Sequence, residues 1–428
     1  MKIVFIVPGS GGTFYCENCL RDAALVQAFR RQGHDVTMVP IYLPFFTDEP
    51  DVAGGTPVFF GGINVFLQEK FPFYRHAPRW LTRVFDSRPL LELATRRSGS
   101  TQPLGMGKMT LSMLQGTEGH HVAELGRMVE WLEREGRPDV IQISTALLLG
   151  LARPLREKLG SRIVCLAQDE DTWVDELDKP YDALCWEAIR HTSADADVLV
   201  AASQQYADVF AQQAGMPRER LKVVYPGIDV KGYAEWTDVR QRRPPCVGYL
   251  SKMTGSMGLG TLVEAYILLK ARPDFRDLRL RAMGGATGDD PKFLAGLRRR
   301  LVAKGMEADV EFLPELDRAS RIAFLQSLSA LSVPAPRGVA FGTFLLEAMA
   351  AGVPVVQPNA GAFAELVQAT GGGVIYEPNT AEGLAEALAK VLGEPGKAME
   401  LGRRGRSAVL ERFTVEQMAT KMIEVYRQ

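Results

Sequence analysis

The chain has 428 residues, of which 46% are hydrophobic and 24% charged, and its formal net charge is −1. A single hydrophobic core rarely serves a chain of this length, so two or three domains are expected. The balanced charge argues against general affinity for nucleic acid, which requires a basic face. Five cysteines in so long a chain do not form a disulfide framework, and we expect reduced thiols of a cytoplasmic protein.

The first residues, Met1 to Pro8, hold a short apolar run that ends at a proline. This pattern predicts a first β-strand and not a signal peptide. No apolar run in the sequence approaches the ~18 residues that are needed to span a bilayer. We therefore expect a protein that meets a membrane, if at all, only from its surface.

Short apolar runs alternate with longer stretches of helical periodicity, which is the pattern of parallel sheets with crossover helices. In the first half we expect a helix over Glu17–Gln32 and strands over Lys2–Val7, Asp35–Pro40, Pro138–Ser144, Arg162–Ala167, Asp197–Ala202 and Lys222–Tyr225. In the second half we expect strands over Cys246–Leu250, Leu278–Met283, Val310–Leu313, Ala330–Val333 and Val353–Gln357.

Residues 226–245 separate these two halves and are rich in proline, glycine and charged residues, which is the composition of a linker. The sequence therefore predicts an α/β fold of two Rossmann-like domains that face each other across a cleft. The first would span residues 1–225 and the second residues 246–411.

Residues 70–97 interrupt this regularity with seven basic and only two acidic residues, interleaved with aromatic side chains. One interpretation is an acceptor-binding insertion that touches anionic lipid at the inner membrane face or a sugar phosphate. The other is an ordinary solvated helix whose arginine stems lie on the core.

The stretch from Val339 to Glu347 predicts a loop with Phe341 and Gly342 at its tip, followed by a short helix that starts near Thr343. A helix that begins after a glycine loop offers unpaired backbone N–H groups and the positive end of its dipole, a suitable seat for phosphate. Glu347 lies one turn inside this helix, where its carboxylate could accept hydrogen bonds from sugar hydroxyls.

A second candidate for phosphate binding follows the strand Cys246–Leu250. Ser251, Lys252 and Thr254 supply hydroxyls and a cation next to glycine-permitted backbone N–H groups, as in an anion-binding nest. Arg337 could add a further cation. The alternative is that Lys252 is simply solvated and the glycines only turn the chain.

Several motifs occur in a characteristic order: Gly33-His34-Asp35-Val36, Pro226-Gly227-Ile228-Asp229, the segment 332–361, and Gly371 to Ile375. Together they resemble the family 4 glycosyltransferases of the GT-B fold over nearly the whole chain. The resemblance implies that a closing helix within residues 412–428 packs back onto the first domain.

The same resemblance implies a retaining transfer of a hexose from a UDP- or GDP-sugar to a hydroxyl of a glycan or lipid-linked acceptor. Glu347 would then bind the ribose, and Gly11 and Gly12 would lie near the sugar or the acceptor. Gln168 occupies the position of a histidine found in the family, and Asp169 beside it is a further catalytic candidate. The family requires no cofactor besides the nucleotide sugar, and no metal is expected.

Three positions depart from the family pattern. Val339 replaces a glutamate, Tyr249 replaces an arginine and Met257 replaces a lysine. Each missing cation removes a charge-assisted hydrogen bond worth about 1.5–3 kcal/mol. The alternative function is therefore a degenerate GT-B protein that binds a sugar, a nucleotide or a partner without transfer.

Cys16 and Cys19 lie at the predicted start of the first helix, where the helix dipole lowers a thiol pKa. This spacing occurs in redox and zinc sites, but no further cysteine or histidine nearby completes four zinc ligands. We expect two small side chains that pack beside the glycine loop.

Overall fold

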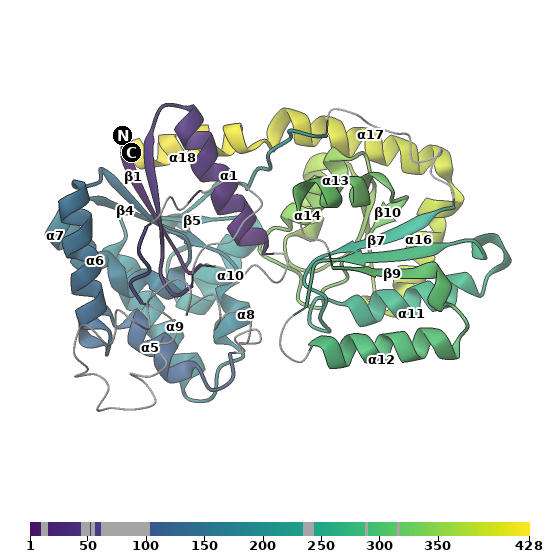
Figure 1. Ribbon diagram of the computed structural model, residues 1–428, viewed down its shortest axis with the longest axis horizontal. Coiled ribbons are helices and arrows are strands. Elements are labelled where there is room, and N and C mark those ends of the chain that lie inside the picture. The colour runs from purple at the N-terminus through teal and green to yellow at the C-terminus, as the bar shows by residue number, and fades with distance from the viewer. Residues whose placement is uncertain are drawn as a thin grey trace. The chain divides into compact units, whose positions relative to one another are not determined.

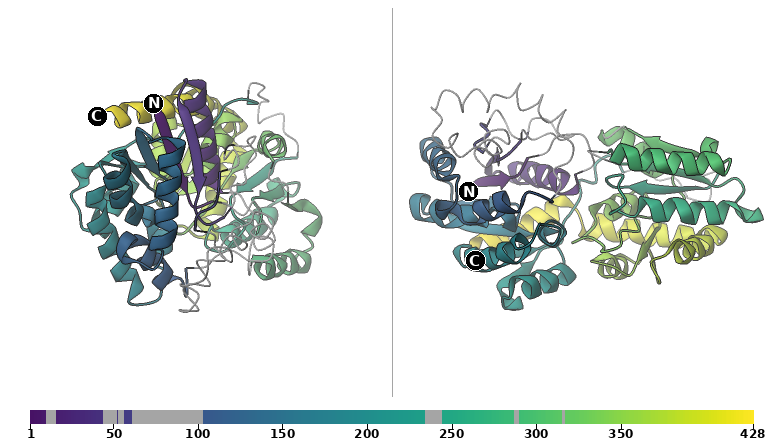
Figure 2. Two further views of the ribbon diagram at one scale, coloured as in Figure 1. Left: turned by 60° about the vertical axis from the view of Figure 1, so that its left-hand side comes forward. Right: turned by 90° about the horizontal axis from the view of Figure 1, so that it is seen from below.

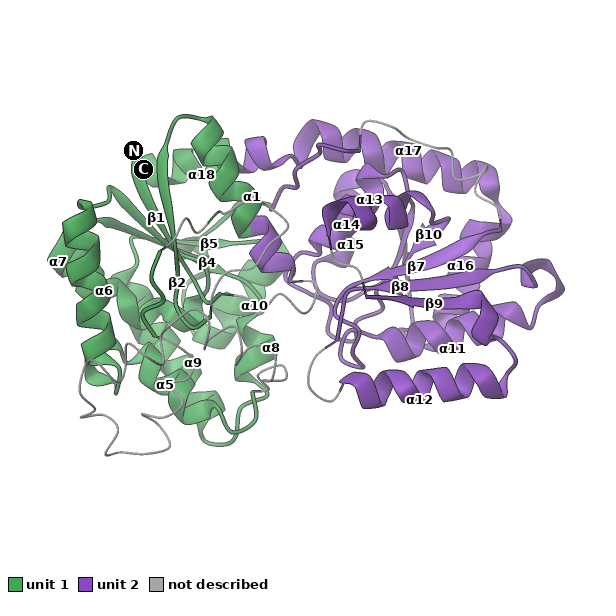
Figure 3. Ribbon diagram, viewed as in Figure 1, with its two compact units in different colours: residues 1–12, 22–225, 419–428 green, residues 13–21, 226–418 purple. Residues whose placement is uncertain are grey.

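The computed structural model describes residues 1–9, 16–43, 52, 56–60, 103–233, 244–286, 290–314 and 317–428. Gly11, Gly12 and residues 70–97, for which we predicted binding roles, lie outside this range. The chain divides into two compact units (Figure 3). Unit 1 comprises residues 1–12, 22–225 and 419–428, and unit 2 comprises residues 13–21 and 226–418.

Each unit contains a six-stranded sheet whose strands are all parallel, with helices packed around it (Figures 1 and 2). The predicted α/β class and the expected pair of Rossmann-like folds are therefore confirmed. No helix in the described ranges is both long and apolar enough to cross a membrane.

The sheet of unit 1 has the strand order β2-β1-β3-β4-β5-β6. Its strands are β1 (Lys2–Val7), β2 (Asp35–Pro40), β3 (Val140–Ile143), β4 (Arg162–Ala167), β5 (Val198–Ala201) and β6 (Leu221–Val223). The central strands β3 and β5 are buried at every position, as expected for parallel strands covered on both faces.

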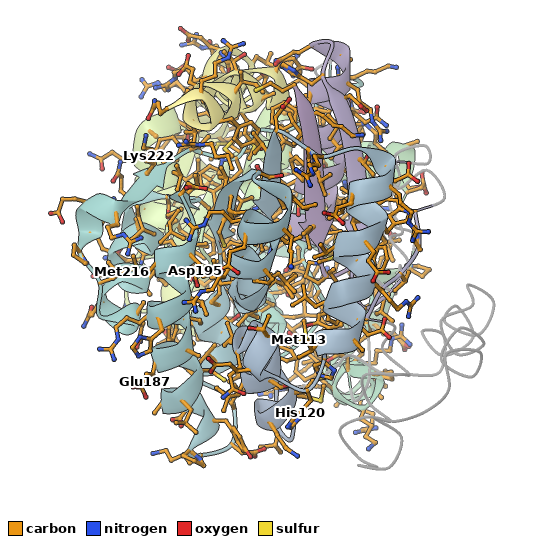
Figure 4. All side chains as sticks on the ribbon, turned by 90° about the vertical axis from the view of Figure 1, so that its left-hand side faces the viewer. Met113, His120, Glu187, Asp195, Met216 and Lys222 are labelled. Carbon is orange, nitrogen blue, oxygen red and sulfur yellow. A yellow bond between two sulfur atoms is a disulfide. The ribbon has the colours of Figure 1, made fainter. Side chains whose placement is uncertain are left out.

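The helices of unit 1 connect these strands and cover the sheet. They are α1 (Glu17–Arg31, whose first five residues belong to unit 2), α5 (Gly107–Leu114), α6 (Val122–Glu135), α7 (Ala152–Leu159), α8 (Glu170–Val174), α9 (Tyr181–Thr192) and α10 (Gln204–Ala214), with short 3-10 helices η2 (Gly116–Glu118), η3 (Ala146–Leu151), η4 (Ser193–Asp195) and η5 (Arg218–Arg220). In Figure 4, Met113 marks α5 and Glu187 marks α9, which pack against each other.

The last helix, α18 (Val415–Arg427), contributes its final residues to unit 1. The Tyr426 hydroxyl donates to the side-chain oxygen of buried Gln142 on β3, and its ring lies 5.7 Å from that of Phe29. The end of the chain is thus part of the core of unit 1.

The sheet of unit 2 has the strand order β12-β11-β10-β7-β8-β9. Its strands are β7 (Cys246–Leu250), β8 (Arg279–Met283), β9 (Val310–Leu313), β10 (Ala330–Leu331), β11 (Val355–Pro358) and β12 (Gly373–Tyr376). Its helices are α11 (Leu259–Lys270), α12 (Asp290–Ala303), α13 (Arg318–Gln326), α14 (Thr343–Ala350), α15 (Phe363–Thr370), α16 (Ala381–Gly393) and α17 (Pro395–Arg412), with 3-10 helices η7 (Pro273–Phe275) and η8 (Glu307–Asp309).

Four strand predictions were too long at their carboxyl ends, those for β3 and β5 by one residue and those for β6 and β10 by two. Strand β6 ends at Val223 instead of Tyr225, and β10 ends at Leu331 instead of Val333. In the second case, the N–H of Val333 donates to the side chain of Gln357 and not to a neighbouring strand. The chain therefore leaves the sheet early and forms the loop that leads to α14.

Candidate functional site

The strand order of unit 2 reverses between β7 and β10, which lie side by side with Val247 opposite Ala330. In open parallel sheets, ligands bind outside the carboxyl ends of the strands at such a reversal. The two loops that follow these strands, residues 251–258 and 332–342, are therefore the first candidates for a binding site. They lead into α11 and α14.

The loop after β7 is closed by the side chain of Tyr249. This buried hydroxyl donates to the backbone oxygen of Lys252 at 2.8 Å and lies 3.3 Å from that of Met257. The hydroxyl of Thr254 accepts from the N–H of Met257 at 3.2 Å. At Gly258 a Cβ would come within 2.1 Å of the oxygen of Pro334, so the two candidate loops pack tightly together.

Lys252 is only 25% exposed, and its Nζ lies 3.6 Å from a carboxylate oxygen of Asp290 at the start of α12. Ser251 and Thr254 are buried beside it. The structure thus brings the predicted loop residues together. It also shows Lys252 in an ion pair and not as a merely solvated cation.

The loop after β10 places its predicted residues in different surroundings. Arg337 is exposed, whereas Phe341 is buried and its ring lies 6.4 Å from that of Phe413. Val339 accepts a backbone hydrogen bond from Ala362. Phe341 therefore anchors the loop to the core by packing, and Arg337 is the accessible cation of this loop.

Helix α14 begins at Thr343, after Gly342 in the left-handed conformation with φ of 94°. The backbone N–H groups of Gly342 and Thr343 both donate to the same carboxylate oxygen of Glu17, at 3.0 and 2.5 Å. Glu17 also belongs to unit 2, although it is the first residue of α1. The predicted seat for phosphate therefore holds an anion supplied by the chain itself, which the sequence analysis missed.

Glu347 is 6% exposed and lies in a buried polar cluster. Its Oε1 accepts a hydrogen bond from Nε of Arg321 at 2.9 Å and lies 3.3 Å from the hydroxyl of Tyr233. Arg321 is itself only 2% exposed, and burial raises the pKa of the Tyr233 hydroxyl, which remains a donor. Neither partner could be predicted from the sequence, because both come from segments far from Glu347 along the chain.

The carboxyl ends of β3 and β4 form the corresponding edge in unit 1. The side-chain amide of Gln168 donates to the backbone oxygen of Ser144 at 2.7 Å, which joins the two strand ends. Asp169 follows with φ of 55°, and within the described ranges it is the only residue other than glycine with a positive φ. Both predicted catalytic candidates thus lie at the carboxyl edge of this sheet.

Glu170, the next residue, is 1% exposed and accepts four hydrogen bonds. Oε1 accepts from the hydroxyl of Thr145 and the N–H of Ala146, both at 2.8 Å. Oε2 accepts from the N–H of Gln168 at 2.6 Å and the hydroxyl of Tyr206 at 2.9 Å. Burial raises the pKa of this carboxyl to about 6, although the four donors act in the opposite direction.

The expectation that the cysteines are all reduced was wrong for one pair. Cys16 and Cys19 form a disulfide across the first turn of α1, with their Cα atoms 5.3 Å apart. A separation of three residues at a helix start brings two thiols within bonding range. The other three cysteines are free and buried: Cys165, Cys185 and Cys246. In the part of the chain that the structure describes, no group of His, Cys, Asp and Glu is arranged to hold a metal ion.

Two protein families match consecutive parts of the chain. Residues 108–231 match the family described as Glycosyltransferase Family 4, and residues 238–408 match that described as Glycosyl transferases group 1. The chain belongs to the family 4 glycosyltransferases. Its fold is GT-B, in agreement with the two parallel six-stranded sheets.

Curated relatives match part of the length of this chain. The D-inositol 3-phosphate glycosyltransferase of Rhodococcus opacus is 26% identical over 269 residues, which cover 61% of this chain and 60% of the relative. The lipopolysaccharide core biosynthesis mannosyltransferase LpsB of Rhizobium meliloti is 29% identical over 217 residues, 48% of this chain and 60% of LpsB. The chain therefore spans only part of its relatives: 60% of the Rhodococcus opacus enzyme and 52% of the D-inositol 3-phosphate glycosyltransferase of Jonesia denitrificans.

Solved structures match the whole chain at low sequence identity. Anabaena Alr3699/HepE, crystallised in complex with UDP, has a TM-score of 0.68 at 18% identity, with 99% of each chain covered. Sucrose-phosphate synthase from Thermosynechococcus elongatus has a TM-score of 0.71 at 17% identity, covering 100% of this chain and 99% of the synthase. These similarities show the shared fold.

Proposed function

We propose that this protein is a retaining glycosyltransferase that moves a hexose from a UDP- or GDP-sugar to a hydroxyl of a glycan or lipid-linked acceptor. The observation that carries the proposal is the start of α14, where the N–H groups of Gly342 and Thr343 hold the Glu17 carboxylate. Two backbone donors that converge on one anionic oxygen can equally bind a phosphate oxygen. Alr3699/HepE has been crystallised with UDP, which makes UDP the first nucleotide to test.

The diphosphate would replace the Glu17 carboxylate at α14. Lys252 and Arg337 are the cations available from the two loops at the β7–β10 reversal. Tyr249 supports this arrangement without a charge, because its hydroxyl holds the backbone of Lys252 and thereby fixes the loop. Tyr249 and Met257 thus replace two cations of the family pattern, and the Tyr249 hydroxyl instead holds the loop through backbone oxygens.

Glu347 remains the candidate for binding the ribose. The carboxylate of Glu347 forms an ion pair with the buried guanidinium of Arg321. Such a group is a strong acceptor for the hydroxyls of a ribose. Arg321 and Tyr233 would then act by positioning Glu347.

The transfer requires no protein nucleophile. The bond between the sugar C1 and the diphosphate oxygen breaks, the acceptor oxygen bonds to C1 on the same face, and the departing diphosphate takes the acceptor proton. Backbone N–H donors at α14 and the nearby cations stabilise the charge that develops on the diphosphate. The start of α14 and the nearby cations would thus bind the diphosphate and also stabilise it as the leaving group.

The alternative, a protein that binds a nucleotide or sugar without transfer, is favoured by one observation. Val339 cannot accept hydrogen bonds from hexose hydroxyls through its side chain, so a sugar would need other partners. This alternative predicts nucleotide binding without turnover.

Calorimetric titration with UDP, GDP and ADP, followed by measurement of UDP release from UDP-glucose, tests the proposal. We expect binding of at least one nucleotide and slow release of the corresponding product. Glu347→Ala should abolish binding and Lys252→Ala should weaken it. Lys292→Ala, which removes an exposed lysine of α12, is the matched control and should bind as the native protein does.

The three possible outcomes separate the hypotheses. Binding with turnover, lost in Glu347→Ala, supports transfer. Binding with no turnover of UDP-, GDP- or ADP-glucose supports the degenerate alternative. No binding of any of the three nucleotides overturns transfer and leaves the degenerate alternative only as a protein that binds a sugar or a partner.

A further inference from the structure

We propose that Glu170 is a positioning residue for the transfer reaction, whose buried carboxylate fixes the turn after β4 and so holds Asp169 in place for the acceptor hydroxyl. This inference rests on the proposed glycosyl transfer. It concerns unit 1 and not the candidate nucleotide-binding site at the start of α14 in unit 2.

The first observation is that Glu170 joins three separate segments at the carboxyl edge of the sheet. Its two oxygens bind the segment after β3 through Thr145 and Ala146, the end of β4 through Gln168, and α10 through Tyr206. The hydroxyl of Tyr206 also accepts from the N–H of Glu170 at 2.6 Å. Both the backbone and the side chain of Glu170 are therefore held by the same tyrosine.

The second observation is the backbone strain of the residue that this cluster encloses. Asp169 has φ of 55°, a left-handed conformation that side chains other than glycine rarely adopt. Glu170 binds the N–H of Gln168 on one side of Asp169, and Tyr206 binds the N–H of Glu170 on the other. Hydrogen bonds on both sides of a strained residue are a specific means of maintaining it.

The third observation concerns two buried polar atoms beside the turn. Oε1 of Gln168 and the hydroxyl of Ser144 have no hydrogen-bond partner among the residues that the structure describes. Both residues are more than nine-tenths buried. A buried acceptor without a donor is costly, and a ligand hydroxyl can supply that donor. The turn that Glu170 fixes is thus next to groups suited to a polyhydroxylated molecule.

All four hydrogen bonds to the Glu170 carboxylate come from donors, so the carboxylate has to be ionised to accept them all. A proton on either oxygen would face one of these donors and displace it. Since burial raises the pKa of Glu170 to about 6, this displacement occurs within an accessible pH range. The cluster should therefore loosen as the pH falls through about 6.

The buried hydroxyl and the two buried thiols around Glu170 do not change charge in this range. Burial raises the pKa of the Tyr206 hydroxyl on α10 and of the Cys165 thiol on β4, so both stay neutral. Helix α9, which packs on α8, has Cys185 on its buried face, and the pKa of that thiol is raised to about 12. The neighbouring Asp169 and Asp171 carry the other nearby charges. The segment of η3 that faces Glu170 is uncharged.

The test compares native protein, Glu170→Gln and the matched control Glu124→Gln, which alters another buried glutamate of unit 1. We expect the native rate of UDP release from UDP-glucose to fall up to tenfold per pH unit below about 6. In Glu170→Gln the rate should be low at all pH values and this acidic limb should be absent. The dissociation constant of UDP should be unchanged, and Glu124→Gln should keep the limb.

A stability measurement separates positioning from a general structural role. Native Glu170 has a pKa above its ordinary value of 4.5, so the folded protein binds the proton more tightly than the unfolded chain. The contribution of Glu170 to the unfolding free energy therefore rises as the pH falls from about 6 to 4.5, while activity falls. A residue that acted only through overall stability would make the two change together.

Amide hydrogen exchange keeps the inference testable if UDP-glucose is not turned over. The N–H of Gln168 should be protected at pH 8, lose protection below pH about 6 in native protein, and be unprotected in Glu170→Gln throughout. An acidic limb and amide protection that persist unchanged in Glu170→Gln would overturn the inference. If the native protein binds no nucleotide, the proposed function is overturned. The exchange experiment then still decides whether the Glu170 carboxylate fixes the turn after β4.

Discussion

Each unit buries a glutamate near the candidate functional groups, and the two units compensate its charge in opposite ways. In unit 2, Glu347 is paired with the buried guanidinium of Arg321. In unit 1, Glu170 is surrounded by neutral donors: two N–H groups and two hydroxyls. The first carboxylate has a permanent countercharge, whereas the second has none.

The two carboxylates therefore differ in whether a partner carries a charge. A guanidinium stays protonated at any accessible pH, so Glu347 has a constant partner. Neutral donors only partly offset the cost of burying a charge, and the pKa of Glu170 is accordingly raised to about 6. Burial alone therefore does not determine how a carboxylate behaves, because the nature of its partners does.

The largest expected effect comes from breaking the charged pair in unit 2. Arg321→Met would leave Glu347 buried without its countercharge, which typically costs about 3–5 kcal/mol of unfolding free energy. Urea denaturation at pH 7.5 measures this loss. The double variant Arg321→Met/Glu347→Leu should recover most of the stability, and a double variant no more stable than the single one would contradict the pairing.

A smaller effect is expected from weakening the neutral cluster in unit 1. Tyr206→Phe removes one hydroxyl bound to Glu170, and hydrogen bonds to charged groups contribute about 1.5–3 kcal/mol. Loss of this donor should raise the pKa of Glu170 further and move the acidic limb of the activity profile to higher pH. Tyr266→Phe, which removes a buried hydroxyl bonded to the oxygen of Leu278 in unit 2, should destabilise the protein without moving the limb.

The anion at α14 permits a test in which a mutation improves binding. Glu17→Ala removes the carboxylate with which the nucleotide diphosphate competes, and we expect UDP to bind about three- to tenfold more tightly, equivalent to roughly 0.7–1.4 kcal/mol. The vacated N–H groups should lower the unfolding free energy by about 0.5–2 kcal/mol, as for the loss of a helix cap. Calorimetry measures the first quantity and urea denaturation the second, and weaker UDP binding would show that Glu17 helps to hold the donor.

The smallest effect is expected from Asp290→Asn, which removes the carboxylate 3.6 Å from Lys252. Ion pairs at partly exposed positions contribute about 0–1 kcal/mol, so stability should change little. Lys252 would then be available to the diphosphate, and UDP should bind about twofold more tightly at low salt. A calorimetric titration at 20 and 300 mM salt should show this gain only at the lower concentration.

The fold could be predicted largely from local patterns. Strands β1, β4, β7 and β9 have the bounds that the apolar runs indicated, and helix α18 lies within the residues that the resemblance indicated. A parallel strand buried on both faces has to be apolar at consecutive positions, so its extent is visible in the sequence. Other strands differ from their predicted bounds by one or two residues, and β10 is short because the side chain of Gln357 accepts the hydrogen bond of the Val333 N–H.

The site could be predicted only where its residues are neighbours in the sequence. Ser251, Lys252 and Thr254 form one loop, and Gly342 and Thr343 begin one helix, as their types and spacing suggested. Partners that arrive from distant segments have no such signal. Glu17 is 326 positions from Thr343 in the sequence, and Tyr233 is 114 positions from Glu347. At such separations the residue types alone do not indicate which side chains will be in contact.

The path of the chain through the two units has a practical consequence. Unit 2 includes residues 13–21, and unit 1 includes residues 419–428, so neither unit is one continuous stretch of sequence. A fragment cut at the linker, such as residues 226–418, would lack Glu17 and leave the α14 amides without their carboxylate. A fragment 1–225 would lack Tyr426 and leave buried Gln142 without its hydroxyl partner. Dissection of this chain into halves would therefore leave each half with an incomplete core or an incomplete site.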